Sequence, residues 1–516
     1  MLLVNRKKLK FLNFITINWI QPSSSERLSE ISQTMHLTTT IAFRTSPNHN
    51  IHDLPIELLA LIIEILYTSS SFGWKDTRYW IDSDLHDPSI FPCSVANVCQ
   101  LWRNVMAAVP HYWTQFALDL ASKEPLLLDA LLWSKDLPFT ILIFDSRLHA
   151  SGAQARTQGL SQEQERIAVE ALTTALQPHL QRCEALSYDV EYSGSIPTLI
   201  FALEHCSEKL EKLELDFIRD DCEPFFRFQG CEPCIPAPVS PSWTFPALER
   251  LSIDAKTFMF VAGHFMWRDL ITSAEPEDGL TLEISRHAFL EEPDNVLVVE
   301  SLSCFLHYLA ELPSVTTLIL RDLSSHPHVT ENTLVPTKKL VDAYYFEGIN
   351  LSRDFLSVFF KAFALPDEAT FVACAFPSNT SLGLSESLTL KSLPMNSRFE
   401  RCFQGWRGET LTFDRCPSFD NDTLDLLAEI GGYEDCCPAS RVSSLTIRNC
   451  RNFSYQALKE LVLQRKRMAP AFEFVEEIRT LILGGKVPRI TKEELEWFEG
   501  NVTNLYMSGR KSLPTE

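Results

Sequence analysis

The sequence has few of the residues from which cofactor and catalytic sites are usually built. Its 516 residues include only 17 glycines, and neither GxGxxG nor GxxxxGK[ST] occurs among them. The glycine-rich loops that cradle phosphate groups are therefore missing. GxSxG and HExxH, which mark many serine hydrolases and zinc proteases, are absent as well. The 13 histidines are scattered along the chain. We therefore predict no enzyme and no cofactor; an enzyme built on a leucine-rich α/β domain is the alternative, and no motif favours it.

Basic residues are also in short supply. Lys and Arg number 46 against 67 Asp and Glu, a formal net charge of -21. Binding to nucleic acid relies on clustered cations that neutralise phosphates, so this balance argues against such a partner. No run reaches the roughly 18–20 apolar residues of a membrane helix, so we expect no membrane partner. The apolar stretch 11–20 follows a basic run like a secretion signal, but Asn13 and Asn18 interrupt it and no cleavage site follows.

The cysteines point to a reducing compartment. There are 14, too few for a disulfide scaffold in a chain of this length. We expect buried thiols in a cytoplasmic or nuclear protein. Cys231 and Cys234 have zinc-ligand spacing, but a structural zinc site needs four ligands and no second pair lies nearby. Pro236, Pro238 and Pro241 rule out the helix that a thioredoxin-like site needs. We read this stretch as a loop and predict no metal.

Residues 54–113 predict a small helical unit with an unusual first helix. Between Leu54 and Leu66 the only charged residues are Glu57 and Glu64, which fall near one line along the helix. A surface helix normally has one apolar stripe, so this one needs cover on a second side. Pro55 suits the first helical position. A second, amphipathic helix is predicted from an N-cap at Ser94 to Val109, followed by Trp113.

This ordered set of residues resembles the F-box domain, in the form abundant in mushroom-forming fungi. The resemblance rests on Leu54-Pro55-x-Glu57-Leu58-Leu59, Ile62, Ile65-Leu66, Val98-Cys99-x-x-Trp102-Arg103 and Pro110-x-x-Trp113. It departs from the family at about 67–94, where a polar and acidic insertion replaces a short turn and a middle helix. The resemblance implies adaptor contact through Leu54, Pro55, Ile56, Leu58, Leu59 and Ile62. It implies an F-box core of Val98, Cys99, Trp102 and Trp113.

After residue 120 short leucine-rich strands recur with helical stretches between them. The strand starts Leu411, Leu445 and Leu481 are 34 and 36 residues apart. Cys416 and Cys450 follow the first two at the same offset. Such units cannot bury an apolar face alone and must stack, which predicts a solenoid. The pattern resembles the cysteine-containing leucine-rich repeat; an ordinary α/β sheet domain is the alternative.

The predicted fold class is α/β: a small all-α F-box followed by an irregular leucine-rich-repeat solenoid of strand–helix units around a curved parallel sheet. We assign residues 1–50 to a disordered extension, with Met1 or Met35 as the start, 51–120 to the F-box and 121–510 to the repeats. Loop insertions are predicted near 220–242, 272–279 and 431–440.

Strand residues between the inward leucines are predicted to face the concave side of the solenoid, where such proteins bind partners. The candidates for substrate binding are Asp216, Asp254, Arg321, Lys391, Asp414 and Arg448. The acidic members in the early units suggest a basic partner segment. By resemblance, the chain is the substrate-recognition subunit of a Skp–cullin–F-box ubiquitin ligase, with the Skp adaptor, the cullin scaffold and an unknown protein substrate as partners. The alternative is a non-ligase interaction scaffold with a degenerate F-box.

Overall fold

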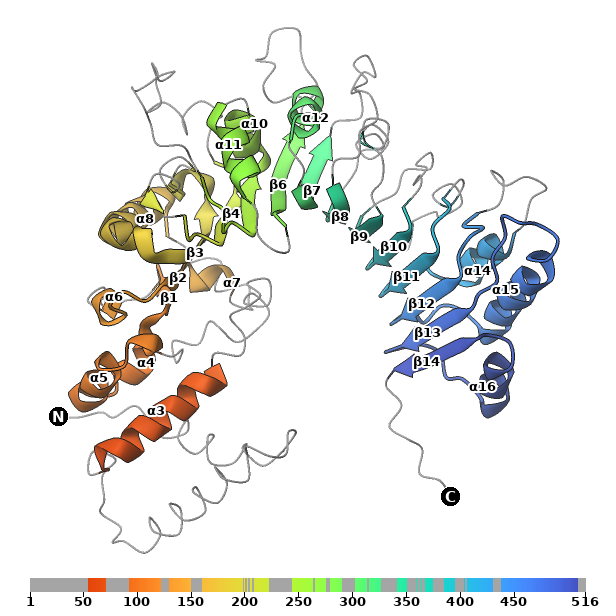
Figure 1. Ribbon diagram of the computed structural model, residues 1–516, viewed down its shortest axis with the longest axis horizontal. Coiled ribbons are helices and arrows are strands. Elements are labelled where there is room, and N and C mark those ends of the chain that lie inside the picture. The colour runs from red at the N-terminus through yellow and green to blue at the C-terminus, as the bar shows by residue number, and fades with distance from the viewer. Residues whose placement is uncertain are drawn as a thin grey trace, which may run out of the picture.

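A single curved sheet organises the whole molecule. In the computed structural model fourteen strands pair in the order in which they occur along the chain, β1 to β14, and every pairing is parallel. The strands line the inner side of an arc, and the helices of the later units lie outside it (Figure 1). Parallel neighbours need a crossover connection, and helices α14 (Asn421–Ala428), α15 (Tyr455–Met468) and α16 (Lys492–Glu499) of the last crossovers lie on the convex side (Figure 1).

The structure describes, with short gaps, residues 54–70, 92–121, 130–149, 160–221, 244–289, 302–325, 341–349, 359–374, 385–429 and 438–508. The strands are β1 Gln115–Asp119, β2 Phe139–Phe144, β3 Cys183–Tyr192, β4 Lys212–Arg219, β5 Arg250–Asp254, β6 Thr281–Phe289, β7 Val315–Ser325, β8 Val341–Glu347, β9 Glu368–Val372, β10 Ser387–Lys391, β11 Thr410–Asp414, β12 Ser444–Arg448, β13 Thr480–Gly484 and β14 Asn504–Ser508. The helices are α3 Ile56–Ser70, α4 Cys93–Ala96, α5 Gln100–Ala107, η4 Pro110–Trp113, α6 Ala130–Trp133, α7 Ser146–His149, α8 Gln162–Leu176, η6 Gln177–Arg182, η7 Ser193–Ser195, α10 Ala255–Ala262, α11 Phe265–Ser273, α12 Leu302–Ala310, α14 Asn421–Ala428, α15 Tyr455–Met468 and α16 Lys492–Glu499.

The prediction of an α/β chain with a curved parallel sheet is confirmed. Strands are present at 139–143 and at every leucine-rich segment predicted from the sequence, namely those that start at Leu186, Leu213, Leu251, Leu280, Leu318, Leu388, Leu411, Leu445, Leu481 and Leu505. Three further strands were missed: β1, β8 and β9. Their inward residues explain why. Tyr344 and Phe346 occupy the leucine positions of β8, and Ala369 and Phe371 occupy those of β9. Aromatic and small side chains fill the same buried positions, so a search for paired leucines passes over them.

A backbone repeat runs through the eight units from β6 to β13. Their aligned inward residues are Leu282, Leu318, Tyr344, Ala369, Leu388, Leu411, Leu445 and Leu481. Four residues after each of these, the backbone adopts a positive φ between 50° and 63°, at Arg286, Asp322, Gly348, Ala373, Ser392, Arg415, Asn449 and Gly485. Only two of these residues are glycine, although a left-handed non-glycine residue costs about 1–2 kcal/mol.

Hydrogen bonds between units stabilise this turn. From unit to unit the N–H of the left-handed residue donates to the next strand, as Ala373 N does to the Lys391 carbonyl at 2.9 Å and Ser392 N to the Asp414 carbonyl at 2.8 Å. The residue that follows is buried in each of five successive units, namely Ile349, Cys374, Leu393, Cys416 and Cys450. The predicted buried cysteine is thus one variant of a position that also accepts aliphatic residues.

The N-terminal helical unit differs in detail from expectation. α3 begins at Ile56, and the carbonyl of Pro55 accepts from the Leu58 and Leu59 N–H groups, so Pro55 stands just before the helix instead of at its first position. The single helix predicted from Ser94 is instead two short helices, α4 and α5, interrupted at 97–99. The predicted extension 1–50, most of the insertion at 67–94, most of the three loop insertions, and the pair Cys231 and Cys234 lie outside the described residues.

Candidate interaction surfaces

One face of α3 belongs to the core. Leu59 and Ile63 are at most 1% exposed and pack with Trp102, Met106 and Trp113, which are also buried. Their spacing of four residues puts both on the same side of the helix. α3 thereby packs with α5 and η4 as one unit. The faces of α3 that do not pack on this unit differ in their exposure to solvent.

Polar contacts secure the same interface. The Tyr112 hydroxyl donates to Glu64 at 2.6 Å, and the Trp113 indole N–H donates to the Met106 carbonyl at 2.8 Å. Tyr67 packs edge-on against His111, with ring centroids 5.2 Å apart. Burial, together with the hydrogen bond to Glu64, raises the pKa of Tyr112 well above its ordinary value. Glu64, predicted only as part of a polar line, is therefore a structural residue of the unit.

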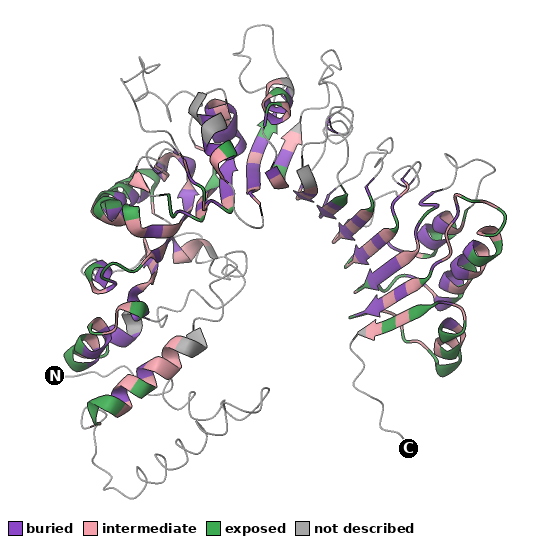
Figure 2. Cartoon of the chain, in the orientation of Figure 1, coloured by how far each residue is buried: buried purple, intermediate pink, exposed green. Residues whose placement is uncertain are grey.

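The other side of α3 exposes apolar surface. Leu61 is 42% exposed, and Leu58, Ile62 and Ile65 are half-buried beside it. Ile56, 55% exposed, lies at the start of the helix on the stripe of Leu59 and Ile63. Figure 2 shows this exposed and intermediate colouring along the helix. Leu54 is half-buried and Pro55 is exposed at the helix start. Leu61 was missed from sequence because it does not belong to the residues that carry the family resemblance.

Two assignments in this unit need correction. Leu59, proposed as an adaptor contact, is buried in the core, because it faces α5 with Ile63. Val98, proposed as a core residue, is 43% exposed, because the break between α4 and α5 turns it outward. Cys99 is half-buried against the core. Trp102 and Trp113 lie in the core, as the resemblance implied.

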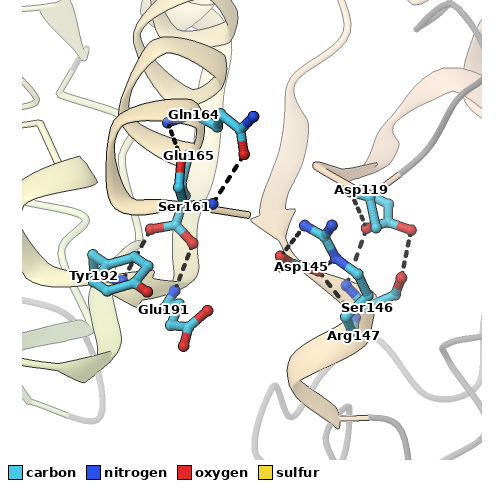
Figure 3. Close-up of polar contacts among 10 residues, drawn as sticks. Asp119, Asp145, Ser146, Arg147, Ser161, Gln164, Glu165, Glu191 and Tyr192 are labelled. Atoms are coloured by element: carbon cyan, nitrogen blue, oxygen red, sulfur yellow. Dashed lines mark hydrogen bonds and ion pairs between the residues drawn. The ribbon is translucent and has the colours of Figure 1, made fainter. Parts of the chain in front are cut away.

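Two carboxylates that accept hydrogen bonds from the chain itself lie at the first strands of the sheet (Figure 3). Glu165 of α8 is fully buried and accepts from the main-chain N–H groups of Glu191 and Tyr192, each at 2.9 Å. Burial raises its pKa above the ordinary value. Asp119, at the end of β1, accepts from the Ser146 N–H at 3.0 Å and from its hydroxyl at 2.7 Å. Each acid is used by the chain itself, so neither is a candidate for catalysis.

An ion-pair ladder crosses the concave face of β4 to β8. It consists of Lys212, Glu214, Arg250, Glu283, Arg321 and Glu347, which alternate in sign. Lys212 and Arg250 each lie 3.1 Å from Glu214, Arg250 also pairs with Glu283, and Arg321 lies 2.6 Å from Glu283 and 2.9 Å from Glu347. Burial alone would raise the pKa of Glu214, but Lys212 and Arg250 hold it below its ordinary value. The ladder has three cations and three anions, so this half of the concave face is balanced internally.

Three proposed substrate contacts are already engaged in this half. Asp254 is 4% exposed, and its carboxylate accepts from the N–H and hydroxyl of Thr257 at the start of α10. Asp216 lies 2.7 Å from Arg286, and burial raises its pKa to about 6 against the opposing effect of that arginine. Arg321 belongs to the ladder. Asp254 is therefore a buried helix cap and is removed from the proposed contacts, whereas a basic partner segment at the half-buried Asp216 stays a prediction.

The concave face of β10 to β13 has a different character. Thr389, Thr412 and Thr446 lie side by side in register and continue the row begun by Thr370 of β9. One row further along, Lys391, Asp414 and Arg448 are also in register. Lys391 is half-buried and Arg448 is exposed. Neither has an ion-pair partner within the part of the chain that the structure describes, whereas Asp414 accepts from the Asn449 amide at 2.9 Å.

The convex side of this half contains one buried cation. Arg465 of α15 is 1% exposed, and its guanidinium donates to the carbonyls of Leu427, Pro438, Ala439 and Ser440 at 2.6–3.0 Å. Leu427 lies in the last turn of α14, where free carbonyls carry partial negative charge. Arg465 belongs to the basic run Arg465-Lys466-Arg467 in the sequence, but in the structure it connects α14, α15 and the segment 438–440.

Comparison with protein-family models and with curated proteins gave no match for this chain. Among the described helices none is long and apolar enough to cross a membrane. Within the same residues no three potential ligands group into a metal site. The described cysteines are free thiols. What remains are two surfaces suited to contact with other proteins: the outer face of α3 and the concave face of the sheet.

Proposed function

We propose that this chain is the substrate-recognition subunit of a Skp–cullin–F-box ubiquitin ligase. In this proposal α3 binds the Skp adaptor, and the concave sheet holds a target protein. The chain would supply binding surfaces, and the ubiquitin-transfer chemistry would belong to other subunits.

The observation that carries the proposal is the two-sided helix α3. One side buries Leu59 and Ile63 in its own unit, while the opposite side carries a row of Leu58, Leu61 and Ile65, of which Leu61 is 42% exposed and the other two are half-buried. Each large aliphatic side chain gains about 1.5–3 kcal/mol when removed from water. A surface helix normally has one apolar stripe, so a second apolar row on α3 favours contact with another protein. This second row begins within the segment that resembles the start of an F-box.

The burial of Leu59 changes how the adaptor contact should be tested. A charge at Leu59 would unfold the unit, so loss of binding would not report on the surface. We therefore choose Ile56→Asp combined with Leu61→Asp, both on exposed positions. The matched control is Ile167→Asp on α8, which is 53% exposed against 55% for Ile56.

The experiment is co-expression of the full chain with the Skp adaptor, followed by co-purification. The native chain and the Ile167→Asp variant should retain the adaptor, and the Ile56→Asp, Leu61→Asp variant should lose it while keeping its circular dichroism spectrum. A native chain that folds but purifies without the adaptor would favour the non-ligase scaffold instead. Retention of the adaptor by the double variant would contradict the assignment of α3.

A further inference from the structure

The carboxyl ends of β10 to β13 form a basic edge on an acidic protein. We define the basic edge as Lys391, Arg415, Arg448, Arg451 and Lys486. All but the half-buried Lys391 are exposed. The four turn segments that contain them, 391–394, 414–417, 448–451 and 484–487, include a single acid, Asp414. In a chain of net charge -21, five cations against one anion in four adjacent turns depart strongly from the average.

These cations have few partners of their own. Arg415 lies 3.5 Å from Asp414, and that is the one ion pair along the edge among the described residues. The corresponding edge of β6 and β7 contrasts with this, because Arg286 is paired with Asp216 and Arg321 with Glu347. The basic edge therefore retains charge that the earlier units have already neutralised.

The opposite edge of β10 and β11 carries the other sign. Glu386 and Glu409 are exposed immediately before β10 and β11. At the same edge Arg479 is exposed immediately before β13 and is paired with Glu476 at 2.6 Å, so the separation of acids from cations holds for β10 and β11. Between the two edges lies the threonine row, in which the hydroxyls of the half-buried Thr389 and Thr412 can donate to a carboxylate, whereas Thr446 is buried. An anionic ligand is thus directed to the carboxyl edge.

We infer that the basic edge docks an extended acidic segment, rich in Asp and Glu, of the target protein. Strands lie about 4.8 Å apart, so β10 to β13 span about 14 Å, which an extended chain covers with about four residues. The patch is too short for the long phosphate track of a nucleic acid and matches a brief acidic run. This inference rests on the proposed target-binding role of the concave face and does not depend on the adaptor contact at α3.

The test is binding of a fluorescent peptide with a central run of glutamates to the full-length protein, measured by anisotropy at low and physiological salt. The native chain should bind it, with affinity falling as salt rises, and the same peptide with glutamines should bind at least about tenfold more weakly. Lys391→Glu combined with Arg448→Glu should weaken binding about tenfold or more, and Asp414→Asn should strengthen it several-fold.

The matched control is Lys466→Glu combined with Lys492→Glu, which makes the same change in charge on α15 and α16, away from the edge. It should bind the glutamate peptide like the native chain. The inference is overturned if the native chain fails to bind this peptide, if the glutamine peptide binds equally, if the edge variant is unaffected, or if a single-stranded oligonucleotide of equal charge binds more tightly. Capture of the Skp adaptor should be unchanged in the edge variant, so failure here is distinguishable from failure at α3.

Discussion

The two halves of the sheet accommodate charge in different ways. In β4 to β8 the charged side chains neutralise one another through the ladder centred on Glu283, which is 2% exposed. In β10 to β13 the concave face carries threonines and cations with few partners, while the buried Arg465 is satisfied entirely by main-chain carbonyls in the contacts described above. The first half uses its charges for internal structure, whereas the second leaves charge available for a partner.

Removing the buried cation should disrupt the second half most. Arg465→Leu leaves the carbonyls around Leu427 and Ser440 without donors in a buried site, and we expect a loss of about 3–5 kcal/mol in the free energy of unfolding. Denaturation in urea followed by circular dichroism measures this loss. Arg467→Leu, two residues along α15 and exposed, is the control and should change stability by less than about 0.5 kcal/mol. Equal effects of the two variants would show that the carbonyl contacts contribute little.

Removing charge from the centre of the ladder should have the next largest effect. Glu283→Gln keeps the shape of the side chain but leaves Arg250 and Arg321 with one carboxylate each, so we expect a loss of about 2 kcal/mol. Glu170→Gln provides the comparison, because Glu170 is 69% exposed and lies 3.5 Å from Arg166. If the ladder contributes no more than a surface ion pair, Glu283→Gln should reduce stability by no more than Glu170→Gln. Thermal unfolding of both variants measures the two losses.

Asp216 offers the smallest effect, and a pH-dependent one. Its pKa is about 6 in the fold, above the ordinary value of 3.8. The folded state therefore binds this proton more tightly than the unfolded state, so the native chain loses stability as the pH rises from about 4 through 6. Asp216→Asn should abolish this loss of stability with rising pH. The stability of the variant relative to that of the native chain should therefore increase from about pH 4 to 6. A difference in free energy of unfolding between the native chain and the variant that stays constant from pH 4 to 7 would contradict this prediction.

Leucine spacing and the recurrent cysteine predicted the parallel sheet, because burial of one face imposes the same residue types at each stacked unit. The same reasoning missed β8 and β9, where Tyr344 and Ala369 occupy leucine positions. It also missed the left-handed residue after each strand, since six of its eight positions carry side chains from Arg286 to Asn449 that have no shared sequence signature.

The candidate surfaces were harder to predict. Two apolar neighbours on α3, Leu58 and Leu59, are equivalent by sequence pattern, yet one is half-buried and the other lies in the core. A rotation of one residue about the helix separates them, and only the packing of α5 and η4 fixes that rotation. Of the predicted concave positions Asp254 is instead a buried helix cap, and the partners of others come from neighbouring units, 26 residues away for Arg321 and Glu347.

The sequence by itself thus determined the class of fold, the two-sided apolar helix, the strand positions with regular leucines and the scarcity of cofactor chemistry. These follow from local periodicity and composition, which each segment carries without reference to the others. The tertiary structure alone decided which acids are neutralised, which cation is buried and which edge remains basic. Those outcomes depend on pairwise distances between units far apart in the chain, and electrostatic energy is set by such distances and by burial.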